Sequence, residues 1–380
     1  MFRPFPAVVL QISEDSTMST ENNSLVKYMD LVRSIRIDHF AYAGVLNALD
    51  YALDSAGHSA NPILLHIMGE YRTGKSCVLR DFMARHPRKR GDGGIQQVIV
   101  YAIVPHDGSV KGLLSALLRA FGDPCWARGS ILDQTGRLLG FLRGTGCRMI
   151  ILDEFQHLSD KGQKKRLDNT TDWLKNLLED APWALVAAGL PESSAVLNRN
   201  AQLGAGRSDA TLTMPLFDWR KGSSRAEFRG ILRAFVAEMH PFELPDLGGE
   251  ELAFRTYLAT NGRVGLLAKL MDRAVHNAIR AQTTKIRLQD ISEAFLQAIW
   301  FAPRFPFEGG PFFCNLTGNE NALIDAATQL ADQDEAYREN GGQVVLHGLD
   351  ANMRTQATER QRSRGRRKSA AGSHELRRAL

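Results

Sequence analysis

The feature that most constrains the fold is the run GEYRTGKS at residues 69–76. It fits the pattern GxxxxGK[ST], in which glycines let main-chain N–H groups wrap phosphates at the N terminus of a helix. An apolar run, NPILLHIMG, precedes the loop, and a helical pattern, KSCVLRDFMARH, follows it. The motif therefore lies in the strand–loop–helix context that it requires, and we predict a phosphate-binding loop.

Each conserved position of this pattern has a chemical task. Lys75 would neutralise charge on the β- and γ-phosphates, and the Ser76 hydroxyl would bind Mg²⁺. We expect ATP and Mg²⁺ as cofactors. The predicted nucleotide-binding residues of the loop are Gly69, Glu70, Tyr71, Arg72, Thr73, Gly74, Lys75, Ser76 and Cys77.

A second acidic element lies in RMIILDEFQHL, residues 148–158. Its apolar strand would deliver Asp153 and Glu154 to the carboxyl edge of the sheet, where open α/β sheets bind ligands. Asp153 would join the nucleotide site and hold Mg²⁺ directly or through water, together with Ser76. Glu154 would polarise the water that attacks the γ-phosphate, as a catalytic residue. The paired acids favour an ATPase over a kinase for small substrates.

Apolar strands alternate with helical segments through the first part of the chain, which predicts an α/β fold with a parallel, doubly wound sheet. From about residue 223 the pattern is wholly helical and predicts a small lid. The expected strands are 61–69, 95–105, 147–155, 182–191 and 210–217. The expected domains are a disordered N terminus (1–25), an α/β core with N-terminal helices (26–222), a helical lid (223–300), a partner-binding extension (301–350) and a basic disordered tail (351–380).

The distribution of charge and the cysteine content indicate which binding partners and which cellular compartment to expect. The net charge is +5, yet residues 351–380 hold nine Arg/Lys against two Glu, while residues 319–350 hold seven acids and one Arg. The tail is a solvated segment that would also attract phosphates weakly. The four cysteines show no CxxC pair and no metal-ligand spacing, so we expect reduced thiols in a cytoplasmic protein. The sequence has no apolar run of about 18 residues, so no membrane contact is expected.

The combination of GEYRTGKS, MIILDEFQHL, LVAAGLPES and a helical lid resembles the AAA+ ATPases. Within them the chain is most similar to the TnsC/TniB transposition regulators. The similarity rests on DEFQHL followed by a helix, on the apolar strand that breaks into GLPE, on the lid run NGRVGLLAKLMDRAVHNAI and on PRFPFE, which resembles an Asn-Pro-Phe-type segment after the lid. It covers roughly residues 35–310.

The resemblance implies an ATPase that assembles on duplex DNA as a ring or helical filament, with about six to seven subunits per turn. It also implies a TniQ-type targeting protein and a TnsB-type transposase as partners, sometimes with a TnsA-type endonuclease. Hydrolysis would reset the assembly. Two other functions stay open: another AAA+ DNA-processing ATPase, such as a helicase loader or motor, and a signalling NTPase that binds only proteins.

Further residues carry over from the family. Arg207 matches an arginine that would act in trans on the γ-phosphate of a neighbouring subunit, with Arg199 as the alternative. In the family a polar residue, the first sensor, stands at a strand tip that corresponds to residues 189–191, but this chain has no Asn or Thr there. The second sensor, an arginine in many AAA+ lids, would align near Gly265 and not at Arg263. Two basic segments, PHDGSVKG and DKGQKKR, could track DNA phosphates without reading sequence. The predicted DNA contacts are Lys111, Lys161, Lys164 and Lys165.

Overall fold

The computed structural model describes residues 25–58, 62–159, 164–179, 183–199, 211–299, 305, 307–315, 324–326 and 328–329. The chain divides into two compact units, one ending at Ile324 and one beginning at Asp325. The first contains an α/β part and a helical part, and both are considered below. No helix of the described residues is long and apolar enough to cross a bilayer.

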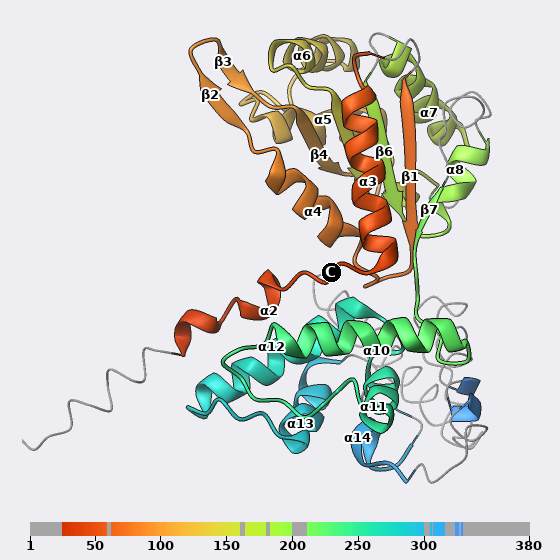
Figure 1. The fold of residues 1–380 in the computed structure, drawn as a ribbon. Coiled ribbons are helices and arrows are strands. Elements are labelled where there is room, and N and C mark those ends of the chain that lie inside the picture. Colours follow the sequence, from red (N-terminus) through yellow and green to blue (C-terminus); the bar gives the residue numbers. More distant parts are fainter. Residues whose placement is uncertain are drawn as a thin grey trace, which may run out of the picture. The chain divides into compact units, whose positions relative to one another are not determined.

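A five-stranded parallel sheet forms the centre of the α/β part (Figure 1). Its strand order is β4-β5-β6-β1-β7, so β1 lies between β6 and β7. The strands are β1 (Ile63–Gly69), β4 (Ile99–Ile103), β5 (Met149–Asp153), β6 (Ala184–Gly189) and β7 (Leu212–Met214). All four neighbouring pairs are parallel, which confirms the predicted α/β fold with a doubly wound sheet.

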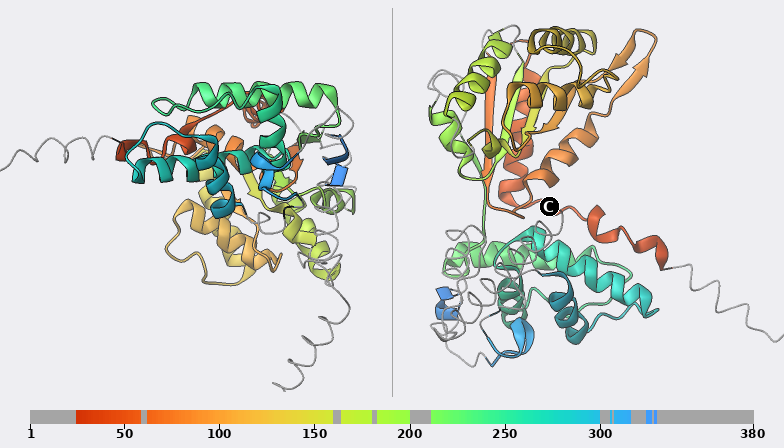
Figure 2. Two further views of the ribbon diagram at one scale, coloured as in Figure 1. Left: turned by 90° about the horizontal axis from the view of Figure 1, so that it is seen from below. Right: turned by 180° about the vertical axis from the view of Figure 1, so that it is seen from behind.

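Helices cover both faces of this sheet. Helices α3 (Phe40–Ser55) and α4 (Lys75–Arg85) contribute to one core cluster, together with Met149 and Ile151 of β5. The other cluster joins Ile150 and Leu152 to four helices, two of which, α5 and α6, are the gold helices in the rear view of Figure 2. These four helices are α5 (Val110–Phe121), α6 (Ile131–Gly144), α7 (Lys164–Glu179) and α8 (Ser193–Arg199). Burial on both faces explains why β5 is apolar at successive positions.

Local sequence signals set the helix ends of the second face. The Ser109 side chain accepts a hydrogen bond from the Gly112 N–H and caps the start of α5. Gly122 ends that helix in the left-handed conformation, with φ of 83°. Helix α6 begins with a capping box between Ser130 and Asp133.

The helical part follows β7, as the sequence predicts. Its helices are α10 (Gly222–Ala237), α11 (Glu250–Thr260), α12 (Val264–Arg280), α13 (Leu288–Ala298) and the short α14 (Gly310–Phe313). The turn between α11 and α12 uses two left-handed residues, Asn261 and Gly262. A Cβ on Gly262 would lie 2.0 Å from the carbonyl oxygen of Phe217, so only glycine fits this close approach.

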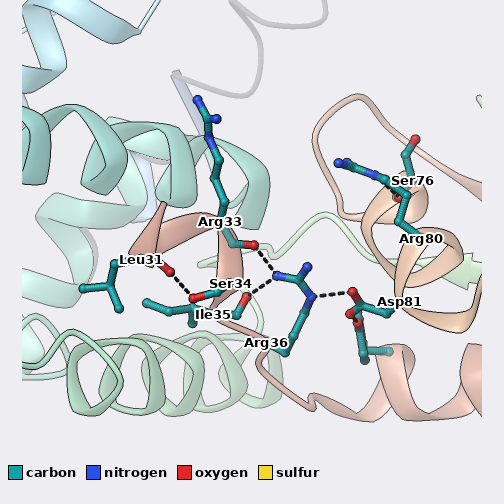
Figure 3. A network of polar contacts seen from close by, with 9 residues as sticks. Leu31, Arg33, Ser34, Ile35, Arg36, Ser76, Arg80 and Asp81 are labelled. Carbon is teal, nitrogen blue, oxygen red and sulfur yellow. Dashed lines mark hydrogen bonds and ion pairs between the residues drawn. The ribbon is translucent and has the colours of Figure 1, made fainter. Parts of the chain in front are cut away.

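The N-terminal helical segment is divided into short pieces. Short turns η1 (Val26–Tyr28) and α2 (Leu31–Ser34) precede α3, and the chain is extended at Ile35. Figure 3 shows the contacts at this point, where the Arg36 guanidinium donates to the carbonyl oxygens of Arg33 (2.5 Å) and Ile35 (2.9 Å) and to Asp81 of α4 (2.5 Å). Asp81 also accepts a hydrogen bond from the Tyr42 hydroxyl of α3. One carboxylate thus ties this segment to two core helices.

The basic run after α4 forms a hairpin. Strands β2 (Lys89–Gly91) and β3 (Gly94–Gln96) pair antiparallel, and all six residues are exposed. Alternating apolar residues, the usual sign of a strand, are missing here because neither face of the hairpin is buried.

Candidate nucleotide-binding site

The loop between β1 and α4 is tightly curled. Gly69 approaches β7 so closely that a Cβ on it would lie 2.7 Å from the carbonyl oxygen of Met214. Arg72 and Gly74 both have positive φ, at 62° and 105°. The Thr73 hydroxyl donates to the Glu70 carbonyl oxygen at 2.9 Å across the loop. These contacts give the curled main chain that a phosphate-binding loop needs.

Lys75 lies inside this loop. Its Nζ donates to the carbonyl oxygens of Gly69 (2.6 Å) and Glu70 (2.9 Å), and the residue is 8% exposed. Burial lowers the pKa of Lys75, although the Asp153 and Glu154 carboxylates act in the opposite direction. A desolvated cation gains most from an anionic partner, so the loop suits a phosphate group.

The N terminus of α4 is also suited to an anion. Gly74 is the residue before the helix, and no side chain among the described residues caps it. The N–H groups of Cys77 and Val78 bond back to the Gly74 carbonyl oxygen. The helix start therefore keeps its positive end open to a ligand.

Asp153 at the end of β5 faces the start of α4. Its Oδ2 accepts hydrogen bonds from the Ser76 hydroxyl and from the Tyr101 hydroxyl, each at 2.8 Å. Tyr101 comes from β4, where it is paired with Ile151. Burial and the Asp153 charge raise the pKa of Tyr101, so its hydroxyl remains a donor at neutral pH.

The Ser76 and Asp153 oxygens fit a magnesium ion. Hydroxyl and carboxylate oxygens are the donors that Mg²⁺ takes from proteins, with phosphate and water oxygens for its other positions. No group of three or more His, Cys, Asp or Glu side chains in the described part of the chain could hold a metal by itself. The donor set therefore matches an ion that arrives with a nucleotide.

Glu154 follows Asp153 in an unusual backbone conformation, with φ of 57°. One of its oxygens, Oε2, accepts a hydrogen bond from Gln156 Nε2 at 2.5 Å. The other end of the same amide, Gln156 Oε1, accepts from the Leu190 N–H at 3.0 Å, just beyond β6. The structure thus brings Asp153, Glu154 and the tip of β6 together at one sheet edge.

The sequence motifs do not mark Tyr101 and Gln156, which complete this arrangement. Tyr101 depends on the register between β4 and β5, and a strand tyrosine carries no motif of its own. Gln156 stands inside the DEFQHL run, so its closeness in sequence to the two acids could have pointed to a place in the site. Its contact with Leu190 depends on how β5 and β6 end, which the local sequence does not specify.

The remaining loop residues lie at its rim. Tyr71 and Arg72 are exposed, and Glu70 is half-buried. Cys77 is partly buried, and burial raises the pKa of its thiol, so the thiolate is disfavoured at neutral pH. This agrees with an inert thiol beside the loop.

The helical part reaches the same loop through α12. The Gly265 N–H donates to the Arg72 carbonyl oxygen at 2.7 Å, and a Cβ at position 265 would lie 2.7 Å from that oxygen. An arginine has no room at this position of the chain. Arg263, directly before α12, is 6% exposed, and its Nη1 donates to the Asn261 carbonyl oxygen at 3.5 Å.

The predicted DNA contacts and the trans-acting arginine are only partly described. Lys111 is exposed in the first turn of α5. Arg207 and Lys161 lie outside the described residues. Lys164 and Lys165 belong to the first turn of α7. The other arginine considered, Arg199, is the last residue of α8.

Two other polar residues of the PHDGSVKG segment have structural contacts. Ser109 caps α5, as described above. The His106 ring lies 4.0 Å from the His157 ring, centre to centre. The ring contact joins the loop after β4 to the segment after β5.

Comparison with known proteins agrees with this fold and site. A family model described as the bacterial TniB protein matches residues 30–212. The ORC2 protein of Aeropyrum pernix, in ADPNP and ADP complexes, superposes with a TM-score of 0.52 at 15% identity, over 70% of this chain and 71% of that one. Cdc6p of Pyrobaculum aerophilum superposes with a TM-score of 0.52 at 15% identity, over 82% of this chain and 90% of that one.

A search of the curated proteins finds no significant match in sequence. At 15% identity the two structural matches establish the fold alone, which is that of the AAA+ ATPases. The family match spans the loop, both acids, four strands of the sheet and the first residue of β7. Residues 30–212 therefore match the TniB family, on a fold that is that of the AAA+ ATPases.

Proposed function

We propose that this protein is an ATP-dependent, DNA-binding regulator of DNA transposition. It oligomerises on duplex target DNA as a ring or helical filament, links target selection to the transposase, and hydrolyses ATP to reset the assembly. The observation that supports the proposal is that Lys75, Ser76, Asp153 and Glu154 lie at one sheet edge, within the residues that match the TniB family model.

The reaction at this site is the hydrolysis of ATP to ADP and phosphate. Lys75 leaves its two carbonyl partners to neutralise the β- and γ-phosphates, and the first turn of α4 donates its N–H groups to them. Ser76 and Asp153 would hold Mg²⁺, which would withdraw charge from the phosphate oxygens. Glu154 accepts a proton from the attacking water through a carboxylate oxygen.

The site is proposed to be completed by a neighbouring subunit. Arg207 supplies positive charge to the γ-phosphate held by the next copy of the chain, so nucleotide occupancy and assembly become linked. This link makes ATP the switch for assembly on DNA. The further partners are a TniQ-type targeting protein, a TnsB-type transposase and, in some systems, a TnsA-type endonuclease, all in the cytoplasm.

Duplex DNA is held by its phosphates. Lys111 on α5 and the lysines at 161, 164 and 165 supply the charge, so binding is tolerant of sequence and falls with rising salt. Replacing Lys111 by glutamate weakens DNA binding, and the matched control is Arg119→Glu at the other end of α5. Equal effects of the two changes would argue against a specific role for Lys111.

The direct test uses duplex DNA, a non-hydrolysable ATP analogue and negative-stain microscopy. Rings or filaments on DNA are expected with the analogue and absent with ADP. Dispersed monomers at high protein and low salt would contradict the proposal. Steady translocation along DNA would indicate a motor instead, and nucleotide-dependent binding of proteins without DNA would indicate a signalling NTPase.

The role of Arg207 has its own test. Arg207→Ala subunits keep an intact loop, whereas Lys75→Ala subunits keep an intact arginine. If the arginine acts in trans, mixing the two inactive variants restores part of the turnover. No recovery over a range of mixing ratios would argue that Arg207 does not act on a neighbour.

A further inference from the structure

Gln156 occupies a buried position between two parts of the sheet edge. It is 8% exposed, and its amide donates to Glu154 Oε2 at 2.5 Å while its carbonyl oxygen accepts from the Leu190 N–H at 3.0 Å. The amide therefore joins a carboxylate directly to the main chain that follows β6. A glutamine is the residue for this bridge, because it offers a donor and an acceptor on one planar group.

The space for this amide is made by Gly189. A Cβ at that position would lie 2.6 Å from Gln156 Oε1 and 3.2 Å from the main-chain nitrogen of Phe155. The last residue of β6 is thus small because the amide packs against it. The bridge is a built feature of the sheet edge, made by residues of two strand ends.

The far end of the bridge is anchored by a series of buried polar groups. The Ser193 hydroxyl donates to the Leu190 carbonyl oxygen at 2.5 Å. That hydroxyl oxygen lies 2.9 Å from His66 Nε2 on β1, and His66 Nδ1 lies 3.4 Å from the Thr211 hydroxyl. Because Ser193 donates to Leu190, it accepts from His66 Nε2–H, so Nδ1 accepts from Thr211.

Burial lowers the pKa of His66, which keeps this series neutral. It runs from Leu190, just after β6, through Ser193 of α8 and His66 of β1 to Thr211, the residue before β7. In the sequence Thr211 directly follows the segment that contains Arg207. The series therefore connects the Glu154 carboxylate with the entry to β7.

We propose that Gln156 is a positioning residue for Glu154, which rests on the proposed ATPase function. By holding Oε2, the amide leaves Oε1 to accept the proton of the attacking water, and it fixes the carboxylate relative to the tip of β6. The backbone of Glu154 has a left-handed φ that residues other than glycine seldom adopt, and the bond from Gln156 holds the carboxylate that this backbone presents.

The test uses a change that separates the two ends of the bridge. Gln156→Glu keeps an oxygen that accepts from Leu190 and replaces the donor that faces Glu154 by a second acceptor. The expected result is a fall in kcat of at least about tenfold at neutral pH, with KM for ATP within about twofold of wild type. The acidic limb of the kcat–pH profile moves up by about one pH unit, because two facing carboxylates do not both ionise easily.

Two further variants keep the test sharp. Gln156→Asn keeps both groups but is too short to span them, so it should also lower kcat, without moving the acidic limb. Gln134→Glu is the matched control, since Gln134 is a fully buried glutamine whose Nε2 donates to Trp126 and Ser115 away from the site. Its kcat per folded molecule should equal that of wild type.

The outcomes are distinct. A wild-type protein that binds ATP without hydrolysing it would overturn both the proposed function and this inference. A wild-type ATPase whose kcat and pH profile are unchanged in folded Gln156→Glu and Gln156→Asn would overturn the inference alone. Should Gln156→Glu fail to fold, the kcat of Gln156→Asn decides.

Discussion

A single methyl group at position 189 probes the packing that the sheet edge depends on. In Gly189→Ala the new Cβ would meet Gln156 Oε1 at 2.6 Å, Ser193 Cβ at 3.0 Å and the Phe155 nitrogen at 3.2 Å. All three distances are shorter than van der Waals contact, and the third atom belongs to the main chain. The amide of Gln156 must move, and its bond to Leu190 is lost.

The energetic cost follows from these contacts. Overpacking a tight site costs about 1–3 kcal/mol, and losing one buried hydrogen bond costs about 1 kcal/mol. Replacing glycine by alanine returns about 0.5–1 kcal/mol through lower chain entropy. We therefore expect a loss of about 2 kcal/mol in the free energy of unfolding, or about 4–8 °C in Tm for a domain of this size.

Urea unfolding and thermal melts measure this loss. The matched control is Gly140→Ala on α6, where an added Cβ meets no heavy atom within 4 Å. Because alanine favours helix, this control should gain about 1 kcal/mol. Equal stability of the two variants would refute the packing account, and an unchanged kcat in Gly189→Ala would show that the amide tolerates displacement.

Three further results are expected. Lys75→Ala should weaken ATP binding roughly tenfold to a hundredfold, because a charged hydrogen-bond donor is lost; equal affinity in a fluorescent-nucleotide titration would contradict this. Phe82→Ala should cost about 3–5 kcal/mol in urea unfolding, since Phe82 is fully buried between α4 and the sheet; a loss near zero would mean that the cluster is not packed as described. Burial lowers the pKa of both His66 and His39 below 6.5, so the unfolded chain binds more protons than the folded one. The stability that these residues contribute is therefore complete above that pH and falls as the pH drops. A wild-type Tm that does not change between about pH 7.5 and about pH 5.5 would contradict this sign.

Much of the fold was predictable because the sheet is buried on both faces. Strands such as β5 and β6 read as continuous apolar runs, and each predicted strand lies where its run occurs. The loop at 69–76 was predictable because its chemistry requires glycine and lysine at fixed distances. The local sequence motif of the loop and the burial of the sheet on both faces therefore made most of the architecture predictable.

The features that escaped prediction depend on contacts between distant segments. The N-terminal segment is tied to α4 through Arg36, whose guanidinium binds Asp81, 45 residues later. The β2–β3 hairpin is exposed on both faces, so no hydrophobic period marks it. Gln156 stood within a recognised run, yet its role as a bridge depends on Leu190 across the sheet edge.

The central claim is that ATP occupancy decides whether the protein assembles on DNA, and Glu154→Gln tests it most directly. This variant keeps Lys75 and the Ser76–Asp153 pair, so it should bind ATP as wild type does while failing to hydrolyse it. Sedimentation with duplex DNA and ATP should show assemblies that persist, whereas those of wild type decay as ATP is consumed. Loss of nucleotide affinity as complete as in Lys75→Ala, or Glu154→Gln assemblies that decay at the wild-type rate, would contradict the account.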